Sequence, residues 1–392
     1  MHKRGLKLRC VSIAFAVLFS TCACAQMSMK MGGPAGSLKD NVLRHSASGT
    51  SLEPASSAPP MLMRMSGKWM EMLHGEVSVA EQQQTGPRGR DKLFSVNWVM
   101  PMAQRTTARG EWTFVSMLSL EPATITGRYY PELFQQGETA FGTAIVDGQH
   151  PHNFFMELAA MYDQSLGKQG LASFYAAPVG DPALGPVAFP HRLSAESNPL
   201  AALAHHLQDS THIAYDVLTG GLTWGPVRLE ASGFHGREPG ENRWTLEAGA
   251  LDSWSTRLTA APARDWIAQY SVGHLHSPEM LHPQEDVLRQ TASVGMHHTW
   301  AAADLDATAV WGRNHTIGTD VNSNGYLWRL KRACGQSNRC GRASRTTIGQ
   351  RIFWARRRRR RKALWAACRP IPAAMRTVSC RPIGARWSWA GS

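Results

Sequence analysis

The sequence predicts an all-β fold, an antiparallel transmembrane β-barrel with long loops and a disordered methionine-rich N-terminal arm. Three observations lead to this prediction. Apolar and polar residues alternate with period two in short segments from about residue 69 to residue 330. Tryptophans gather near the expected ends of these segments. A secretory signal at the N-terminus directs the chain out of the cytoplasm.

Residues 1–26 have the parts of a bacterial signal peptide. Four basic residues in the first nine positions precede a short apolar run, and Ala23-Cys24-Ala25 fits a cleavage site before Gln26. The run is too short to cross about 30 Å of hydrocarbon. A lipoprotein acylated on Cys22 or Cys24 is an alternative, which the residues before each cysteine fit poorly. We expect export through a cleaved signal peptide to the cell outer membrane.

The barrel is expected over residues 67–328, after a mobile arm over residues 27–66 that is rich in Ser, Gly, Pro and Met. Segments of about ten residues joined by tight turns indicate antiparallel pairing. Gly220-Gly221 is one predicted hairpin turn. Alternating segments begin near Phe94, Trp112, Ile213, Val227, Trp254, Trp266, Leu288 and Leu305.

The composition of the two faces decides between two β architectures. A soluble β-sandwich fills its inner face with Val, Ile and Leu. A transmembrane barrel turns its apolar face to lipid and its polar face to a wet lumen. The apolar faces here are rich in Ala and Gly, and the tryptophans fit an interfacial girdle. We therefore prefer the barrel and keep a secreted β-sandwich or lectin-like module as the alternative.

Two long segments, residues 121–153 and 176–209, interrupt the alternation and are rich in Pro, Gly, Asn and His. Barrels carry such insertions as extracellular loops or as plugs of the lumen. Between the two segments, the residues from Phe154 to Tyr162 fit a short helix and a strand equally well.

The alternation stops near Trp328, and residues 329–392 predict a disordered tail. This range holds 18 of the 42 Lys and Arg residues and no Asp or Glu. We interpret it as the product of a frameshift, in preference to a basic arm for anionic lipid or nucleic acid. On this interpretation the last strands of the barrel are missing.

The location of the charges excludes some classes of function. Four more basic residues lie in the first 26 positions, which leaves 20 basic against all 29 acidic residues in the range 27–328. The acidic body removes nucleic acid from the expected partners, although the formal charge of the whole chain is +13. No cysteine lies between residues 25 and 333. A disulfide framework, Cys-ligated zinc and a thiol nucleophile are therefore excluded there.

Methionine is concentrated near the N-terminus, where eight of the 17 fall between residues 27 and 72. Thioethers are soft, uncharged ligands that suit Cu(I) or Ag(I) and stay usable in an oxidising compartment. M-x-M spacing lets the sulfurs of an extended chain converge on one ion. The candidate ligands are Met27, Met29, Met31, Met61, Met63 and Met65. The alternative is that these side chains only face lipid or a core.

Histidine is concentrated as well, with 13 of the 16 between His150 and His315. His150 and His152, in the run DGQHPH, are further candidate metal ligands. An H-x-H pair with carboxylates could bind zinc or copper and leave one position for a hydrolytic water. The spacing is far less specific than H-E-x-x-H, and hydrogen bonds that fix a loop are the alternative role. The sequence has no Gly-rich phosphate loop and no G-x-S-x-G elbow.

Five runs carry a resemblance to a group of known proteins. They are MLSLEPATITGRYYPELFQQGETAFG from Met117, IVDGQHPHNFFMELAAMYD, LAHHLQDSTHIAYDVLTGG, LEASGFHGREPGENRW and QTASVGMHHTW. Over roughly residues 45–328 the chain resembles a family of uncharacterised bacterial secreted proteins regarded as outer-membrane β-barrels. The resemblance implies fold and location, and no reaction. In layout alone, the Met-rich arm before a barrel is similar to copper-resistance outer-membrane proteins of the B type.

We therefore expect an outer-membrane β-barrel that handles copper or another soft metal and is not an enzyme. Two alternatives stay open. One is a periplasmic metal-dependent hydrolase that uses His150 and His152, and the other is a passive, porin-like barrel. No cofactor is certain, and Cu(I) and Cu(II) are the candidates. The expected partners are outer-membrane lipid, the barrel-assembly machinery and metal ions.

Overall fold

A computed structural model describes residues 35–334, except 58, 199, 204, 211–213 and 301–302, together with the backbones of residues 344–356 and 375–380. Most of the regular structure is β-strand, and fifteen strands form one antiparallel sheet. Within the described ranges, no helix is both long enough and apolar enough to pass through a bilayer.

The strands of the large sheet are β1 (Leu62–Ser66), β2 (Trp69–Gln82), β3 (Lys92–Thr106), β4 (Gly110–Leu118), β7 (Phe155–Leu166), β8 (Gly170–Gly180), β9 (Ala214–Trp224), β10 (Val227–His235), β11 (Ser253–Ala263), β12 (Trp266–Leu275), β13 (Val287–Trp300), β14 (Ala303–Thr316), β15 (Val321–Cys334), β16 (Ser344–Arg356) and β17 (Met375–Cys380). A separate hairpin consists of β5 (Tyr130–Ala140) and β6 (Thr143–Gln149). The helical segments are α1 (Leu38–Val42), α2 (Glu121–Thr124) and α3 (His205–Gln208), with 3-10 turns η1 (Thr126–Arg128), η2 (Phe189–His191) and η3 (Leu193–Ala195).

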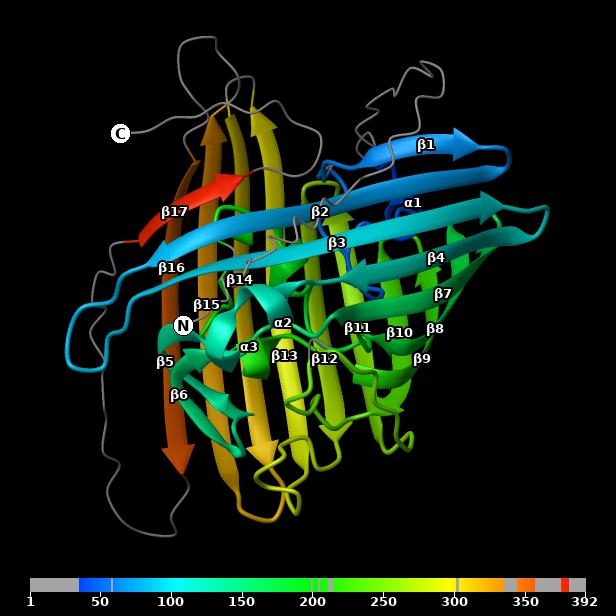
Figure 1. The fold of residues 1–392 in the computed structure, drawn as a ribbon. Helices are drawn as coiled ribbons and strands as arrows, with labels where there is room; N and C mark the ends of the chain where they lie inside the picture. The colour runs from blue at the N-terminus through cyan, green and yellow to red at the C-terminus, as the bar shows by residue number, and fades with distance from the viewer. Residues whose placement is uncertain are drawn as a thin grey trace, which may run out of the picture.

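The large sheet curves into a barrel-like wall around an interior (Figure 1). Its strands pair in chain order, except that β4 pairs with β7 because the β5–β6 hairpin leaves the sheet. The order runs from β1 to β16, and β17 pairs with β2 on the same edge as β1. In the described part of the chain, the two ends of this order do not pair with each other. The wall is therefore a barrel that is not closed.

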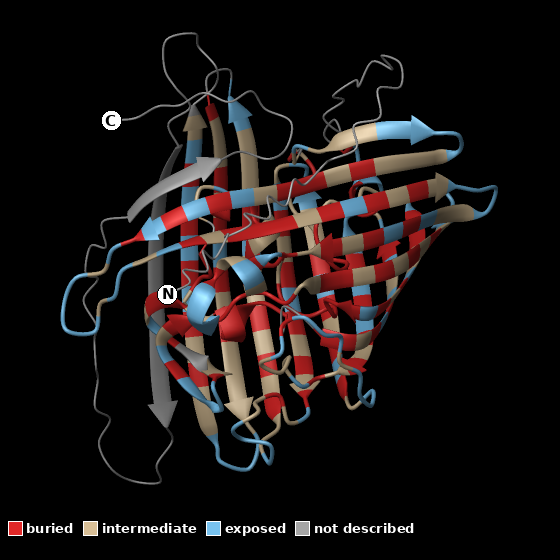
Figure 2. Cartoon of the chain, viewed as in Figure 1, coloured by how far each residue is buried: buried red, intermediate tan, exposed pale blue. Residues whose placement is uncertain are grey.

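Parts of the wall are inverted relative to a soluble protein, because apolar side chains point outward and charged ones inward. In β10, Arg228 and Glu230 are buried, whereas Leu229 between them is 58% exposed. β11 repeats this arrangement with buried Arg257 beside Leu258, which is 48% exposed. Bands of buried and exposed residues alternate along the strands (Figure 2). The outward aromatic side chains include Trp112, Phe114, Phe174, Trp224, Trp254, Trp266, Tyr270 and Trp328. The predicted all-β fold and its alternation are confirmed.

An N-terminal segment, residues 35–57, lies inside the wall. The Nε2 atom of His45 is 2.8 Å from Oδ2 of Asp163, a buried residue of β7. The amide of Gly49 donates to Oε1 of Glu157 on the same strand at 3.0 Å. This segment falls within the range predicted to be a mobile arm. It differs from that prediction because its short polar residues find hydrogen-bond partners in a polar interior, which composition alone does not reveal.

A second internal segment, called here the plug, comprises the described residues between 181 and 210 with η2, η3 and α3. It rests on the inner face of β13–β15. The Nη1 atom of Arg289 on β13 donates to the carbonyl of Asp209 at 3.3 Å, and Asn314 on β14 donates to the carbonyl of His206 at 3.5 Å. The sequence predicts either an extracellular loop or a plug of the lumen for this insertion, and the contacts favour the plug.

Two local predictions differ from the structure or are resolved by it. Phe155–Leu166 forms strand β7, which settles the segment that fitted helix and strand equally well. The hairpin turn predicted at Gly220-Gly221 is wrong: both glycines lie within β9, and the turn follows at Gly225 with φ +57°. Glycine at position 221 instead leaves room for Arg228, because a Cβ atom there would lie 2.9 Å from the Arg228 guanidinium.

The wall also continues into the range predicted to be a disordered tail. β15 extends to Cys334, and β16 and β17 pair with β15 and β2. Arg329 and Lys331 are buried on the inner face, whereas Trp328 and Leu330 are exposed. Positive charges therefore follow the wall pattern there, because the interior is polar. The frameshift remains a prediction.

We expect a charge at the middle of an outward face to destabilise the protein in lipid. Leu258 is the central residue of β11, and Leu258→Arg should lower the free energy of unfolding in phospholipid vesicles by about 2–4 kcal/mol. Leu281, 44% exposed in the loop after β12, provides the matched control. Leu281→Arg should change the free energy by less than about 0.5 kcal/mol. Equal effects of the two substitutions in denaturant titrations would contradict a lipid-facing wall.

Candidate functional site

A cavity of ≈ 240 Å³ lies between α1 and the first strands, and four methionines line it. Met61 precedes β1, Met63 belongs to β1, and Met70 and Met72 belong to β2. The rest of the lining includes Asp40, Arg44, Gln104 and Glu111. The strand alternation explains the grouping, since residues two apart on one strand share a face.

Strand register carries the methionines across the wall. Met63 is paired with Met72, and Met72 is paired with Met102 of β3, so three thioethers follow one another on the inner face of β1–β3. Farther inside, Met100, Met117 and Met161 are 0%, 1% and 1% exposed and belong to the same cluster of buried apolar residues. The interior beside β1–β4 and β7 is therefore rich in sulfur.

The structure places the six predicted methionine ligands differently. It brings Met61 and Met63 together at the cavity. Met65 lies at the end of β1 and is 65% exposed. Met27, Met29 and Met31 lie outside the described residues. The role of each as a ligand remains a prediction.

His150 and His152, the two predicted histidine ligands, contact different carboxylates. Nδ1 of His152 is 2.8 Å from Oε1 of Glu121, and its amide donates to Oε2 of the same residue at 2.8 Å. Nε2 of His150 pairs with Glu138 of β5. The two imidazoles therefore face different carboxylates. A hydrolytic metal centre built on the H-x-H pair would need both imidazoles to face one metal ion. The contacts match the alternative role of fixing a loop.

Glu138 is the centre of a further group of ionisable side chains. One ligand atom each of Glu138, His205 and His206 lies within 4.8 Å of the others. Nε2 of His206 is 2.9 Å from Glu138 Oε1, and Nη2 of Arg243 is 3.3 Å from Oε2. The donor set suits zinc in kind. The guanidinium already supplies a fixed positive charge to this carboxylate, however, so an added cation would meet repulsion.

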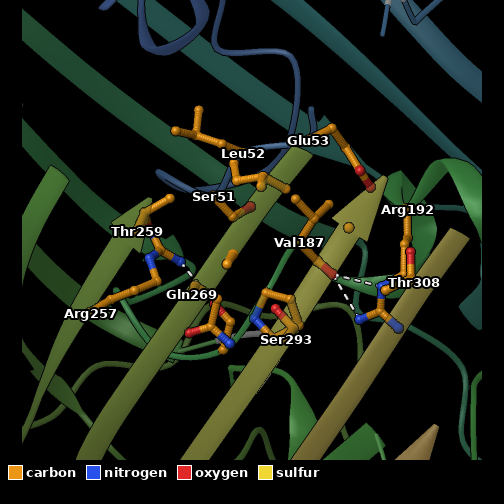
Figure 3. A pocket seen from close by; sticks show the side chains of 15 residues that line it. Ser51, Leu52, Glu53, Val187, Arg192, Arg257, Thr259, Gln269, Ser293 and Thr308 are labelled. Carbon is orange, nitrogen blue, oxygen red and sulfur yellow. Dashed lines mark hydrogen bonds between the residues drawn. The ribbon is translucent and has the colours of Figure 1, made fainter. Parts of the chain in front are cut away.

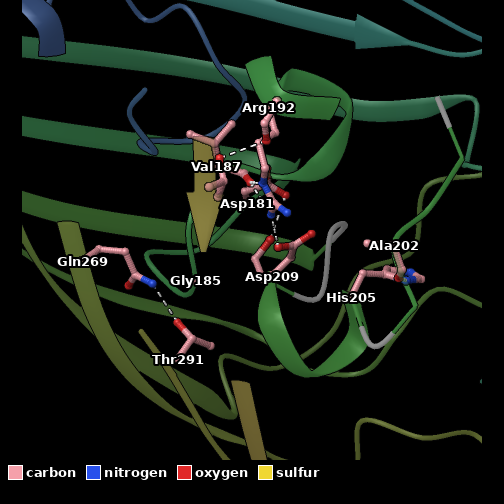
Figure 4. A network of polar contacts seen from close by, with 12 residues as sticks. Asp181, Gly185, Val187, Arg192, Ala202, His205, Asp209, Gln269 and Thr291 are labelled. Carbon is pink, nitrogen blue, oxygen red and sulfur yellow. Dashed lines mark hydrogen bonds and ion pairs between the residues drawn. The ribbon is translucent and has the colours of Figure 1, made fainter. Parts of the chain in front are cut away.

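Away from the methionines, ion pairs and hydrogen bonds of the plug fill the interior. Nη2 of Arg192 lies 2.6 Å from Asp209 Oδ1 and 2.8 Å from the carbonyl of Val187 (Figure 4). Arg192 also lines a cavity of ≈ 30 Å³, enough for about one water molecule, beside Glu53 and Arg257 (Figure 3). The Leu193 amide donates to Glu53 Oε1 at 3.1 Å, which ties the N-terminal segment to the plug.

Burial raises the pKa of two carboxyl groups where the N-terminal segment and the wall meet the plug. Burial raises the pKa of Glu53 from 4.5 to about 7. Asp181, the first plug residue after β8, is 7% exposed, and burial raises its pKa from 3.8 to about 6 although Ser48 and Ser210 donate hydrogen bonds to it. Both groups hold a proton more tightly in the folded protein than in the unfolded chain.

Sequence reasoning did not single out several residues of the sulfur-rich interior. Met100 and Met102 repeat the M-x-M spacing in the run Met100-Pro101-Met102, a signal that was present and unused. Met117 is the only methionine of β4, and Met161 lies five positions after Met156 in β7, which is not the M-x-M spacing, so only the three-dimensional arrangement shows them. Glu138 is likewise separated in sequence from the histidines that it contacts.

Comparisons with known proteins find distant similarity to solved structures and carry no argument about function. No protein-family model matches the sequence, and no curated protein matches it. Similar solved structures include in-vitro folded OmpT, an outer membrane protein of Vibrio cholerae in its trimer form, at 9% identity, with 72% of this chain and 88% of that chain covered and a TM-score of 0.36. A refined porin structure is 11% identical, with 72% and 100% covered and a TM-score of 0.29. Because these identities and TM-scores are low, the fold is described from the strand topology and the burial pattern of this chain alone.

The shifted pKa of Asp181 predicts a dependence of stability on pH. A carboxyl group whose pKa is raised by folding stabilises the folded state below its unfolded pKa, near pH 4, and this stabilisation is lost as the pH rises to about 6. Asp181→Asn, which stays neutral, should remove a decline on the order of 1–3 kcal/mol across that window. The measurement is the thermal midpoint in detergent between pH 4 and 7.

The control for this experiment is Asp320→Asn. Asp320 is exposed in the turn before β15, so its substitution should leave the pH profile of the parent unchanged. A profile for Asp181→Asn that overlays both would show that this carboxyl group is not the source of the decline.

Proposed function

We propose that this chain is an outer-membrane β-barrel that binds a soft metal ion, Cu(I) or Ag(I), in the sulfur-rich part of its interior. The observation that carries the proposal is the convergence of Met61, Met63, Met70 and Met72 on one cavity. The export signal and the inverted wall support the location, and the donor type supports the ion.

The membrane part of the proposal follows from the outward face of the wall. Leucine, tryptophan and phenylalanine side chains cover wall strands whose inward neighbours are arginine, glutamate and serine. Exposing a continuous apolar surface to water costs roughly 25 cal/mol for each Å². Lipid removes this cost, and the strands between the two edges of the wall satisfy their backbone hydrogen bonds by pairing with both neighbours, in a medium without water. A barrel in a lipid bilayer is the arrangement that meets both conditions.

The filled interior favours binding over free passage of solutes. The N-terminal segment and the plug occupy the space inside the wall, and the two cavities described above are small. An open pore would need a continuous aqueous channel along the barrel axis. A passive porin-like role therefore has less support than a binding role.

The soft-metal part of the proposal follows from ligand chemistry. Thioethers bind Cu(I) and Ag(I) well and bind Zn²⁺, Mg²⁺ and Ca²⁺ poorly. Hydrogen bonding by sulfur is weak, so buried methionines cost little when no ion is present. Methionine keeps its ligand sulfur under oxidising conditions that convert exported cysteines to disulfides. The thioether donors of the cavity and the oxidising environment of an exported protein therefore both suit Cu(I) or Ag(I).

Membrane extraction tests the location. After overproduction with its signal, the protein should remain in the membrane pellet through a sodium carbonate wash and should require detergent for release, because its apolar outer face is in lipid. A protein released by carbonate alone would exclude the barrel in the membrane. The sample must show β-sheet circular dichroism, so that aggregated material is not counted as integrated.

Metal titration tests the function. The full chain refolded in detergent should bind Ag(I) in chloride-free buffer, and the variant with Met61, Met63, Met70 and Met72 all changed to leucine should bind at least one ion fewer. Each Met→Leu change preserves side-chain volume and is expected to cost under about 1.5 kcal/mol in stability. The control variant changes Met280 and Met296, outside the cavity, to leucine. Equal uptake by all three proteins would contradict the cavity as the site.

A further inference from the structure

Two histidines meet where the sulfur-rich interior reaches the plug. His74 comes from β2 and His191 from η2, and their ring centroids are 5.4 Å apart. Trp98 of β3 packs against both rings, with centroid distances of 5.1 Å to His74 and 4.5 Å to His191. The three rings therefore pack against one another in one small region between the wall and the plug.

Two methionines complete the surroundings of this region. Nε2 of His191 lies 3.3 Å from Sδ of Met117, which is 1% exposed on β4. Met100, which is 0% exposed, is the cross-strand partner of His74. Two nitrogen donors and two thioethers thus come from three strands and the plug.

The hydrogen bonding of these histidines is poorly satisfied. His74 is 8% exposed, and its Nε2 atom has no hydrogen-bond partner among the described residues. A thioether is a weak acceptor, so the contact with Met117 compensates His191 only in part. A buried polar nitrogen without a partner costs about 1–3 kcal/mol. A ligand that accepts a nitrogen lone pair would remove this cost.

The separation of nitrogen and sulfur fits two ligands of one metal ion. With metal–nitrogen and metal–sulfur bonds of about 2.0 and 2.3 Å, lengths typical of zinc, a distance of 3.3 Å between His191 and Met117 corresponds to an angle of about 100° at the metal. This angle is close to tetrahedral. Glu76, the cross-strand partner of Trp98, adds a carboxyl group on the same face as His74.

We propose that His74, Met117 and His191 form a second site for one soft monovalent cation, Cu(I) or Ag(I), at the junction of wall and plug. This second site would take the same kind of ion as the methionine cavity but lies outside that cavity. The inference rests on the proposed function. Met72 pairs with Met102, and His74 pairs with Met100. The two pairs are two residues apart on β2 and β3, so they are neighbours on the same inner face. An ion in the second site bridges β2 and β4 of the wall to η2 of the plug.

The test uses the full chain refolded in detergent and titrated with silver nitrate in chloride-free buffer. The variants are Met117→Leu and His191→Gln, and the control is Met161→Leu, since Met161 is equally buried in the same cluster. Circular dichroism and heat-dependent gel mobility establish that each protein is folded. Two readouts are used: the number of ions bound for each chain, and X-ray absorption at the silver edge, which separates nitrogen from sulfur neighbours.

We expect Met117→Leu and His191→Gln each to lose one ion for each chain and, with it, the nitrogen neighbours of silver, because only the second site supplies nitrogen ligands. Met161→Leu should match the parent in both readouts. Parental ion counts and nitrogen neighbours in both site variants would overturn the second site while leaving the proposed function standing. A parent protein that binds no silver would overturn both.

Quenching of Trp98 fluorescence gives an independent measurement if a variant fails to fold. A bound silver ion next to this indole should quench part of the parent's fluorescence, and Trp98→Phe should remove that part while keeping the ion. The proposed ligands His74, Met117 and His191 are unchanged in Trp98→Phe, and phenylalanine keeps an aromatic ring at this position, so its ion count should equal that of the parent. Identical quenching in the two proteins would place the ion elsewhere and overturn the second site.

Discussion

The structure depends on one constraint: charged side chains on the inward faces of the wall need partners in a space shut off from bulk water. Glu230 shows how this is met. It lies between Arg228, at 3.1 Å, and Arg257, at 2.9 Å. Arg257 also donates to Oγ1 of Thr50 at 2.8 Å and to the carbonyl of Gly185 at 3.1 Å, so one guanidinium joins wall, N-terminal segment and plug. Breaking such a buried set leaves an uncompensated charge, which costs several kcal/mol.

This constraint divides the interior into two chemically different halves. Arg257 of β11 and Arg289 of β13 donate to carbonyl groups of the plug, whereas β1–β4 and β7 present methionine and aromatic side chains. Consecutive plug residues touch each half: His191 contacts Met117, and Arg192 contacts Asp209. The sulfur-rich half offers soft thioether donors together with Nε2 of His74, which has no hydrogen-bond partner among the described residues. The proposed ion binding therefore belongs to the second half.

The sequence predicted the wall well and the interior poorly, for a physical reason. Alternation is a local property, so Leu229 between Arg228 and Glu230 reveals its face without any knowledge of the fold. Contacts between insertions and the wall are not local. His191 and Met117 are 74 positions apart, and neither stands in a motif that would link them. Composition also failed for the N-terminal segment, because small polar residues are typical of a disordered chain and equally of one that is hydrogen-bonded inside a polar space.

The position of the N-terminal segment has a consequence for assembly. Its residues are bonded to wall strands from distant parts of the chain: His45 to Asp163, and Ser56 through its amide to the carbonyl of Arg264 at 2.9 Å and through its hydroxyl to that of His297 at 3.0 Å. A segment surrounded in this way cannot be inserted sideways through paired strands. Its hydrogen bonds reach parts of the wall that are far apart in the sequence, so the full set forms only once those parts have come together around it.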